Sequence, residues 1–201
     1  MVPKKLFILF PFLILCNACT PAIKNLNNEG LSVVCLGDSI ASGSGVKKEE
    51  SFIGILERKI SKPIINSGIA GDTTENALRR IERDVLSKAP FLVIVELGGN
   101  DYLRKVPKSS TFRNLEGIII KIQGYGAAVV LCDVSSNSIL AGYNSGFKKL
   151  SKRTGSILVP RMMRGILDDP SKKSDFIHPN KEGHRLIAQR IYEEISKYFD
   201  F

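Results

Sequence analysis

Four short polar clusters contain the residue types that nucleophilic catalysis needs. They are 37–39 (GDS), 68–72 (GIAGD), 98–101 (GGND) and 175–180 (DFIHPN). Serine, histidine and aspartate can act as the nucleophile, the general base and the acid that orients the base. Each cluster alone is also typical of a helix cap or a loop, so the chemistry depends on whether the fold brings the clusters together.

Apolar runs and helical periodicities alternate along the chain and predict the elements that position these clusters. Strands are expected at 31–36, 63–66, 91–97, 127–132 and 156–159. Apolar stripes predict helices at 52–60, 77–85, 112–122, within 139–153, and at 186–195. This alternation is typical of parallel strands joined by right-handed crossovers. We therefore expect an α/β fold, a three-layer α/β/α sandwich around a flavodoxin-like five-stranded parallel sheet.

The first three clusters each follow one of the first three expected strands, and the fourth precedes the last helix. The carboxyl ends of parallel strands lie at one edge of a sheet, where such folds bind their ligands. The sequence therefore predicts one site at that edge. Motifs of other enzyme classes are missing: there is no G-x-S-x-G, no Walker A loop and no G-x-G-x-x-G. Metal-ligand spacing is also absent, and no metal or cofactor is expected.

The four clusters in this order resemble the GDSL, or SGNH, hydrolases. The runs NSGIAGDTTENALRRI (66–81) and VIVELGGNDYLR (93–104) are similar to the subgroup of bacterial arylesterases, lysophospholipases and thioesterase I. The resemblance covers about 31–123 and 174–198. It implies Ser39 as nucleophile, His178 as base and Asp175 as the residue that orients His178. It also implies an oxyanion hole made by the backbone N–H groups of Ser39 and Gly71 and the side-chain amide of Asn100.

Two segments depart from the subgroup pattern, and a third has two possible roles. Phe176 stands where the subgroup has a small residue, and we expect it either to line the acyl pocket or to distort its loop. The segment 133–140 (DVSSNSIL) lacks the Arg and Pro of the subgroup, so the substrate preference is not carried over. The stretch 162–167 is a second pocket candidate or a small core cluster. His184 lies at the start of a helix with no orienting acid before it, and a structural role is expected.

The N-terminus is typical of a bacterial lipoprotein signal. Lys4 and Lys5 precede an apolar run at 6–16, and small Ala18 comes directly before Cys19. We expect a signal peptide at 1–18, lipidation of Cys19, a tether at 19–30 and the hydrolase domain at 31–201. The protein would then be an exported cell-envelope lipoprotein, periplasmic or surface-facing. A plain secretory signal or an uncleaved anchor are the alternatives.

The charge of the chain bears on its binding partners, and its cysteines bear on disulfide formation. The chain has 29 Lys and Arg against 20 Asp and Glu, a net charge of +9, but the basic residues are scattered in short pairs. Without a basic block no nucleic acid is expected. Cys35 and Cys132 each lie in an apolar run and are interpreted as small buried residues, although an exported protein allows a disulfide.

The leading hypothesis is therefore an extracytoplasmic serine esterase, a monomer that hydrolyses small carboxylic esters with lipid-like or short acyl groups. Lysophospholipase, thioesterase and carbohydrate O-acetylesterase activities remain open within this class. The alternative from another class is a membrane-tethered lipoprotein that keeps the scaffold for binding. A binding protein has no need of the full set of Ser39, Gly71, Asn100, Asp175 and His178.

Overall fold

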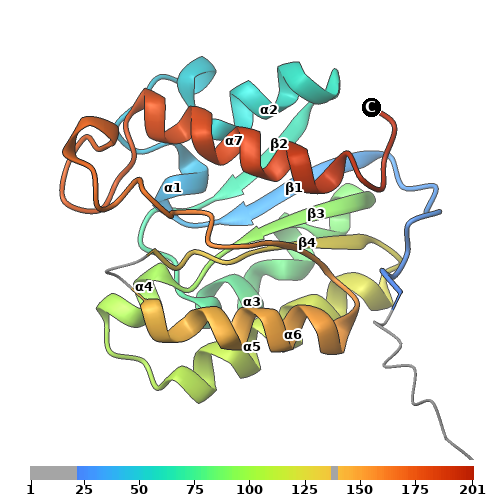
Figure 1. Ribbon diagram of the computed structural model, residues 1–201. Coiled ribbons are helices and arrows are strands. Elements are labelled where there is room, and N and C mark those ends of the chain that lie inside the picture. The colour runs from blue at the N-terminus through green and yellow to red at the C-terminus, as the bar shows by residue number, and fades with distance from the viewer. Residues whose placement is uncertain (1–21, 137–139) are drawn as a thin grey trace, which may run out of the picture.

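A five-stranded parallel sheet forms the centre of the protein (Figure 1). The computed structural model describes residues 22–136 and 140–201. Its strands are β1 (Ser32–Gly37), β2 (Ile64–Gly68), β3 (Pro90–Glu96), β4 (Ala128–Cys132) and β5 (Ile157–Val159). Their order is β2-β1-β3-β4-β5 and every neighbouring pair is parallel. This confirms the predicted fold class, although β2 lies later in the chain than the predicted 63–66.

Helices cover both faces of the sheet and complete the three layers. They are α1 (Ser39–Ser42), α2 (Phe52–Ile60), α3 (Thr74–Asp84), α4 (Gly99–Leu103), α5 (Lys108–Gly124), α6 (Asn144–Thr154) and α7 (Lys181–Ile195). Figure 1 shows α1, α2 and α7 on one face and α3, α5 and α6 on the other. Short 3-10 turns occur at Lys48–Glu50, Leu86–Lys88, Ala141–Tyr143 and Pro170–Lys172.

Side-chain caps set where the main helices begin. The Ser51 hydroxyl accepts a hydrogen bond from the N–H of Gly54 at the start of α2. The Thr73 hydroxyl accepts a hydrogen bond from the N–H of Asn76 at the start of α3. Asn180 caps α7 and fixes the loop before it. Each cap satisfies N–H groups that the first helical turn leaves free.

The strand register aligns the polar clusters at one edge of the sheet. Gly37, the last residue of β1, lies opposite Gly68 of β2 and Glu96 of β3. The residues that follow these three positions therefore begin their turns side by side. This is the physical reason why clusters far apart in the sequence meet at the carboxyl edge.

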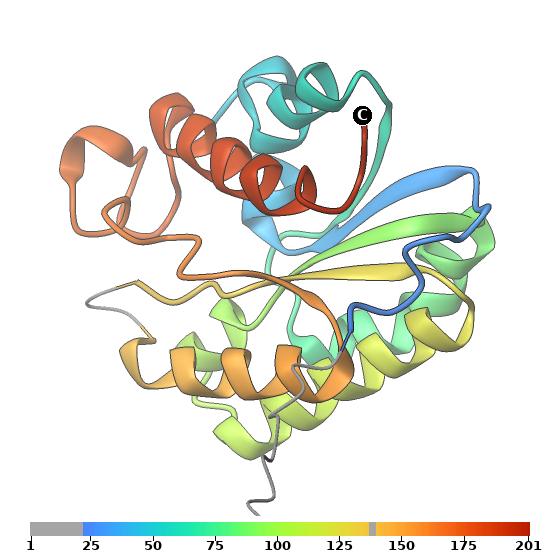
Figure 2. The ribbon, with the colours of Figure 1, turned by 45° about the vertical axis from the view of Figure 1, so that its right-hand side comes forward.

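The segment 22–30, part of the predicted tether, lies against the opposite, amino-end edge of the sheet (Figure 2). The N–H of Lys24 donates to the carbonyl of Gly155 at 3.0 Å. The Asn25 side chain donates to the carbonyls of Gln123 and Ala127. Cys19 and the predicted signal peptide lie outside the described residues. Within 22–136 and 140–201, no helix is long and apolar enough to cross a membrane.

Both cysteines of the domain are buried free thiols. Cys35 lies in β1 and Cys132 in β4, with β3 between these strands. The interpretation of the two as small buried residues is confirmed, and the disulfide that an exported protein allows is not formed between them. Burial raises the pKa of both thiols, so they remain protonated and unreactive.

Candidate active site

Three side chains from the two ends of the chain form a hydrogen-bonded series. The Oγ of Ser39 lies 2.9 Å from Nε2 of His178, and Nδ1 of His178 lies 2.6 Å from Oδ2 of Asp175. The other Asp175 oxygen accepts from the backbone N–H groups of Ile177 and His178, which hold the carboxylate in place. Such a series can take a proton from the serine hydroxyl and stabilise the imidazolium that forms.

The turn between β1 and α1 presents Ser39. The Asp38 carboxylate caps α1 by accepting from the N–H of Ile40 at 3.0 Å. Glycine is required just before it, because a Cβ on Gly37 would come within 2.4 Å of the Ala41 Cβ. The motif Gly-Asp-Ser is therefore explained by packing as well as by chemistry.

Two backbone N–H groups and one side-chain amide are available as donors near this turn. The N–H groups of Ser39 and Gly71 have no acceptor among the hydrogen bonds of the described residues. Gly71 has φ +82°, which favours glycine, and Arg104, the residue after α4, donates to its carbonyl at 2.8 Å. Asn100 lies in the first turn of α4, and its Nδ2 donates to Oδ2 of Asp38 at 3.0 Å. Ser39, Asn100 and His178 line one pocket, whereas Gly71 lies in the neighbouring turn.

Buried polar contacts hold the other two turns. Asp101 is fully buried and accepts hydrogen bonds from both the N–H and the hydroxyl of Thr74. The Asp101 carboxylate therefore links the turn at 98–101 to the start of α3. The guanidinium of Arg80 pairs with Asp72 at 2.7 Å and donates to the carbonyl of Ser67. These contacts fix the Gly71 turn relative to β2.

The electrostatics favour an ionised acid behind the imidazole. Hydrogen bonds from the His178 ring, and then from the backbone N–H groups of His178 and Ile177, lower the pKa of Asp175 to about 2. Asp175 is therefore ionised throughout the range in which proteins are usually assayed. It can keep the Nδ1–H tautomer of His178 in place, which leaves Nε2 facing Ser39.

Glu96 is a site residue that sequence reasoning missed. It ends β3, is fully buried, and its Oε2 accepts from the N–H groups of Asp38 and Ala41 at 3.4 and 3.2 Å. Burial, followed by the charge of Asp38, raises its pKa well above the usual range. Burial also raises the pKa of Asp38 to about 6. The available signal was an acid at the end of an otherwise apolar strand, FLVIVE.

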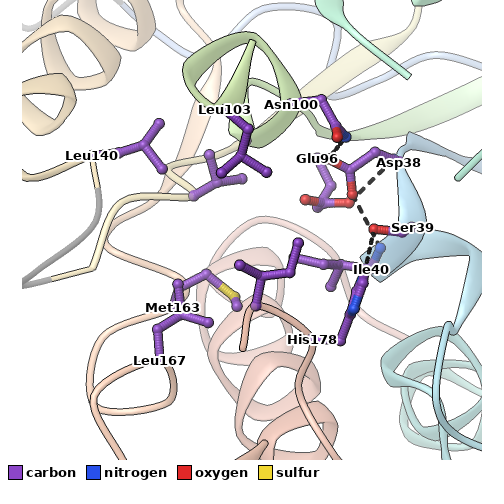
Figure 3. Close-up of a pocket in the computed structure, with 13 residues that line it drawn as sticks. Asp38, Ser39, Ile40, Glu96, Asn100, Leu103, Leu140, Met163, Leu167 and His178 are labelled. Carbon is purple, nitrogen blue, oxygen red and sulfur yellow. Dashed lines mark hydrogen bonds between the residues drawn. The ribbon is translucent and has the colours of Figure 1, made fainter. Parts of the chain in front are cut away.

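An apolar pocket opens beside Ser39 (Figure 3). Its volume is about 480 Å³, part of it open to solvent. The apolar lining is contributed by Ile40, Leu103, Val134, Leu140, Met163, Leu167 and Ile177. Figure 3 shows Leu103 and Leu140 on one side, and Met163 and Leu167 on another. The predicted stretch 162–167 therefore contributes to the pocket, and so do both ends of the segment that departs from the subgroup.

Phe176 does neither of the two things expected of it. Its side chain is 78% exposed and lies outside the pocket, with the Lys173 ammonium 5.7 Å from the ring centroid. The loop carries Asp175 and His178 into contact on either side of it. The expectation was wrong because the Phe176 side chain is directed to solvent. Residues 137–139, the middle of the other departing segment, lie outside the described residues.

His184 has a structural environment. It is fully buried, and its Nδ1 accepts the N–H of Phe52, the first residue of α2, at 3.1 Å. Burial and, to a lesser degree, the charge of His178 lower its pKa to about 4, so the ring is neutral. No cluster of three or more His, Cys, Asp and Glu side chains in 22–136 and 140–201 is placed to hold a metal ion.

Fold and pocket chemistry together define a serine hydrolase of the SGNH type. The chain belongs to the GDSL-like lipase/acylhydrolase family, whose sequence profile matches residues 35–186. Family membership, predicted from the four clusters, is thereby confirmed, and with it a hydrolase and esterase class of activity.

Relatives of known name agree with this assignment. An arylesterase of Vibrio mimicus is 29% identical over 180 residues, covering 83% of this chain and 88% of the relative. The thioesterase 1/protease 1/lysophospholipase L1 of Escherichia coli is 27% identical over 172 residues, covering 82% and 83%. The crystal structure of the psychrotrophic esterase EstA from Pseudoalteromonas is similar with a TM-score of 0.74 and 29% identity, covering 83% of this chain and 97% of that one.

Proposed function

We propose that this protein hydrolyses carboxylic esters with Ser39 as nucleophile. Ser39 Oγ attacks the ester carbonyl carbon while its proton passes to Nε2 of His178. The imidazolium, stabilised by Asp175, then gives that proton to the leaving alcohol, and an acyl-serine remains. Water, deprotonated by the same imidazole, releases the acid and restores the serine. The observation that carries this proposal is the continuous contact from Ser39 through His178 to Asp175.

The charge that develops on the carbonyl oxygen needs preorganised donors. We assign this role to the backbone N–H groups of Ser39 and Gly71 and to Nδ2 of Asn100. Two observations support this assignment. The N–H groups of Ser39 and Gly71 have no acceptor in the described structure, and the hydrogen bond to Asp38 fixes the direction of the Asn100 amide. Each such donor contributes about 3 kcal/mol of transition-state stabilisation in enzymes that use one.

The pocket favours an apolar acyl group. Its leucine, isoleucine, valine and methionine lining can bury a hydrocarbon chain, and methionine adapts to acyl groups of different shape. Lysophospholipids, thioesters and acetylated carbohydrates remain as alternative substrates. A panel of p-nitrophenyl esters of increasing acyl length measures the acyl preference. A carbohydrate O-acetylesterase would prefer the acetyl ester.

The proposed location is the cell envelope, outside the cytoplasm. Residues 1–18 would be removed as a signal peptide, and a lipid on Cys19 would hold the domain 31–201 at a membrane. The proposed protein is a monomer, and its partner is a small ester. A lipoprotein that only binds its ligand is the second candidate.

The two candidates are separated by one experiment on the full-length protein in detergent. Hydrolysis of p-nitrophenyl esters that is lost on treatment with a serine-directed phosphonate supports the esterase. Retention of ester binding without turnover would leave the binding lipoprotein as the better description.

A further inference from the structure

Glu96 lies directly behind the turn that carries the nucleophile. Its Oε2 accepts hydrogen bonds from the N–H groups of Asp38 and Ala41, which lie on either side of Ser39 in the turn. Gly37 leaves the space for this carboxyl group, since a Cβ there would approach Oε2 to 2.9 Å. Among the N–H groups of 38–41, the one on Ser39 is thus the one without an acceptor in the described structure.

We propose that Glu96 is a positioning residue of this site. Its carboxyl group fixes the turn that carries Ser39 and, through Asp38, the direction of the Asn100 amide. The inference rests on the proposed esterase mechanism and adds to it a residue that acts through the backbone of the nucleophile's turn.

One of the two neighbouring acids, Asp38 and Glu96, holds a proton. Asp38 has a donor on each oxygen, from the N–H of Ile40 and from Nδ2 of Asn100. Glu96 Oε1 is fully buried and has no hydrogen-bond partner in the described structure. Two adjacent buried carboxyl groups disfavour double ionisation. Asp38 is therefore the carboxylate, and Glu96 is the neutral acid.

A carboxylate at Asp38 determines which end of the Asn100 side-chain amide it binds. A side-chain amide has one end that donates and one that accepts, whereas an ionised carboxylate only accepts. Asp38 therefore selects the NH₂ end of Asn100, whose second N–H stays free for a developing oxyanion. A protonated Asp38 could instead donate to the amide oxygen, which would turn the wrong end of Asn100 toward the substrate.

The remaining titratable groups near this pair do not disturb that assignment. Cys35 on β1 and Cys132 on β4 face Glu96, and both are held as neutral thiols by burial. His178, on the loop before α7, faces Asp38 and favours its ionised form. In Figure 3, Glu96 and Asp38 lie together between Asn100 and Ser39.

Two variants test whether Glu96 acts through its neutral carboxyl group or only fills space in the core. Glu96→Gln keeps the size and the acceptor oxygen but cannot ionise, whereas Glu96→Ala removes both oxygens. Ile122→Ala, in the core near the C-terminal end of α5, is the matched control for lost packing. Each is assayed for kcat and KM with a p-nitrophenyl ester, and melting temperatures show that the proteins are folded.

We expect Glu96→Gln to keep kcat within about threefold, and Glu96→Ala to lower kcat about tenfold or more with little change in KM. Ile122→Ala should lose stability but not kcat. Infrared spectra at neutral pH should contain a protonated-carboxyl C=O band that Glu96→Gln lacks. In ¹⁵N NMR spectra, the Asn100 side-chain signals should be kept in Glu96→Gln and moved in Glu96→Ala.

Equal losses of kcat in the Gln and Ala variants, full activity of Glu96→Ala, or absence of the infrared band would overturn the assignment. If wild type itself does not hydrolyse esters, the proposed function fails, and the infrared band and the Asn100 signals still decide whether Glu96 is neutral and positions the amide. Unmoved Asn100 signals in Glu96→Ala would count against the positioning role whatever the activity.

Discussion

Ser39 Oγ and His178 Nε2 lie 2.9 Å apart although 139 positions separate them in the chain. Ser39 follows β1 and is the first residue of α1, whereas His178 lies in the loop before α7. The contact therefore exists only when the first and last parts of the domain are both folded. A hydroxyl at this distance can pass its proton to the imidazole without rearrangement of either side chain.

Replacement of Ser39 by alanine should abolish ester hydrolysis in a folded protein. Alanine keeps the backbone of the turn but removes the attacking oxygen, so turnover should fall about a thousandfold or more. The measurement is kcat with a p-nitrophenyl ester, beside circular dichroism of both proteins. Activity within tenfold of wild type would show that Ser39 is not the nucleophile.

Asn100→Ala should lower kcat about a hundredfold with a smaller effect on KM, because an oxyanion donor acts mainly in the transition state. The Asp38 carboxylate also loses the donor on its Oδ2. Steady-state kinetics with the same ester measure the two constants. A rise in KM alone would identify Asn100 as a residue that binds the ground state.

The two histidines should behave differently. His178→Ala should remove activity, since it removes the proposed base. His184→Ala should keep kcat within about threefold but lower the melting temperature, because it removes the acceptor for the Phe52 N–H and opens a cavity. With a pKa of about 4, His184 is neutral above pH 5 and should not affect the pH profile there. Equal losses of kcat at both positions would mean that the base is wrongly assigned.

Glu96→Gln should stabilise the protein increasingly as pH rises from about 5 to 8. The folded-state pKa of Glu96 is raised above its usual value, so the folded protein retains a proton that the unfolded chain releases above that value. The contribution of Glu96 to the stability of the wild type therefore falls with rising pH, by at most about 1.4 kcal/mol per pH unit for one proton. Gln has no proton to release. Urea unfolding at both pH values measures the difference, and a constant difference would contradict a raised pKa.

The sequence predicts the contact of Ser39 with His178 better than it predicts the support behind it. Strand periodicity places 37–39, 68–72 and 98–101 at one edge, because every strand in a parallel sheet ends there. Glu96 depends on the missing Cβ of Gly37 on a neighbouring strand, a tertiary relation that neither residue reveals alone. The prediction for Phe176 was wrong for a similar reason. The direction of a loop side chain is set by tertiary contacts, which the amino-acid sequence alone does not show.

The pocket should face away from the membrane if Cys19 carries a lipid. Lys24 is bonded to Gly155 at the amino-end edge of the sheet, whereas Ser39 lies at the carboxyl edge. The seven residues of β3 separate these edges by about 23 Å. Three residues, 19–21, connect the lipidation position to the described chain and span about 10 Å when extended. A lipid on Cys19 would therefore leave the pocket facing away from its own membrane.

Lipidated protein in vesicles should then hydrolyse a soluble ester as fast as a Cys19→Ser form, which should not bind the vesicles because it lacks the lipid chain. An ester lipid confined to the same vesicles should be cleaved no faster than the same lipid in separate vesicles, since the pocket faces away from the membrane that holds the protein. Rates are compared at equal total lipid, with sedimentation to verify attachment. Preferential cleavage within the host vesicle would show that the segment 22–30 leaves the sheet edge and lets the pocket turn toward the bilayer.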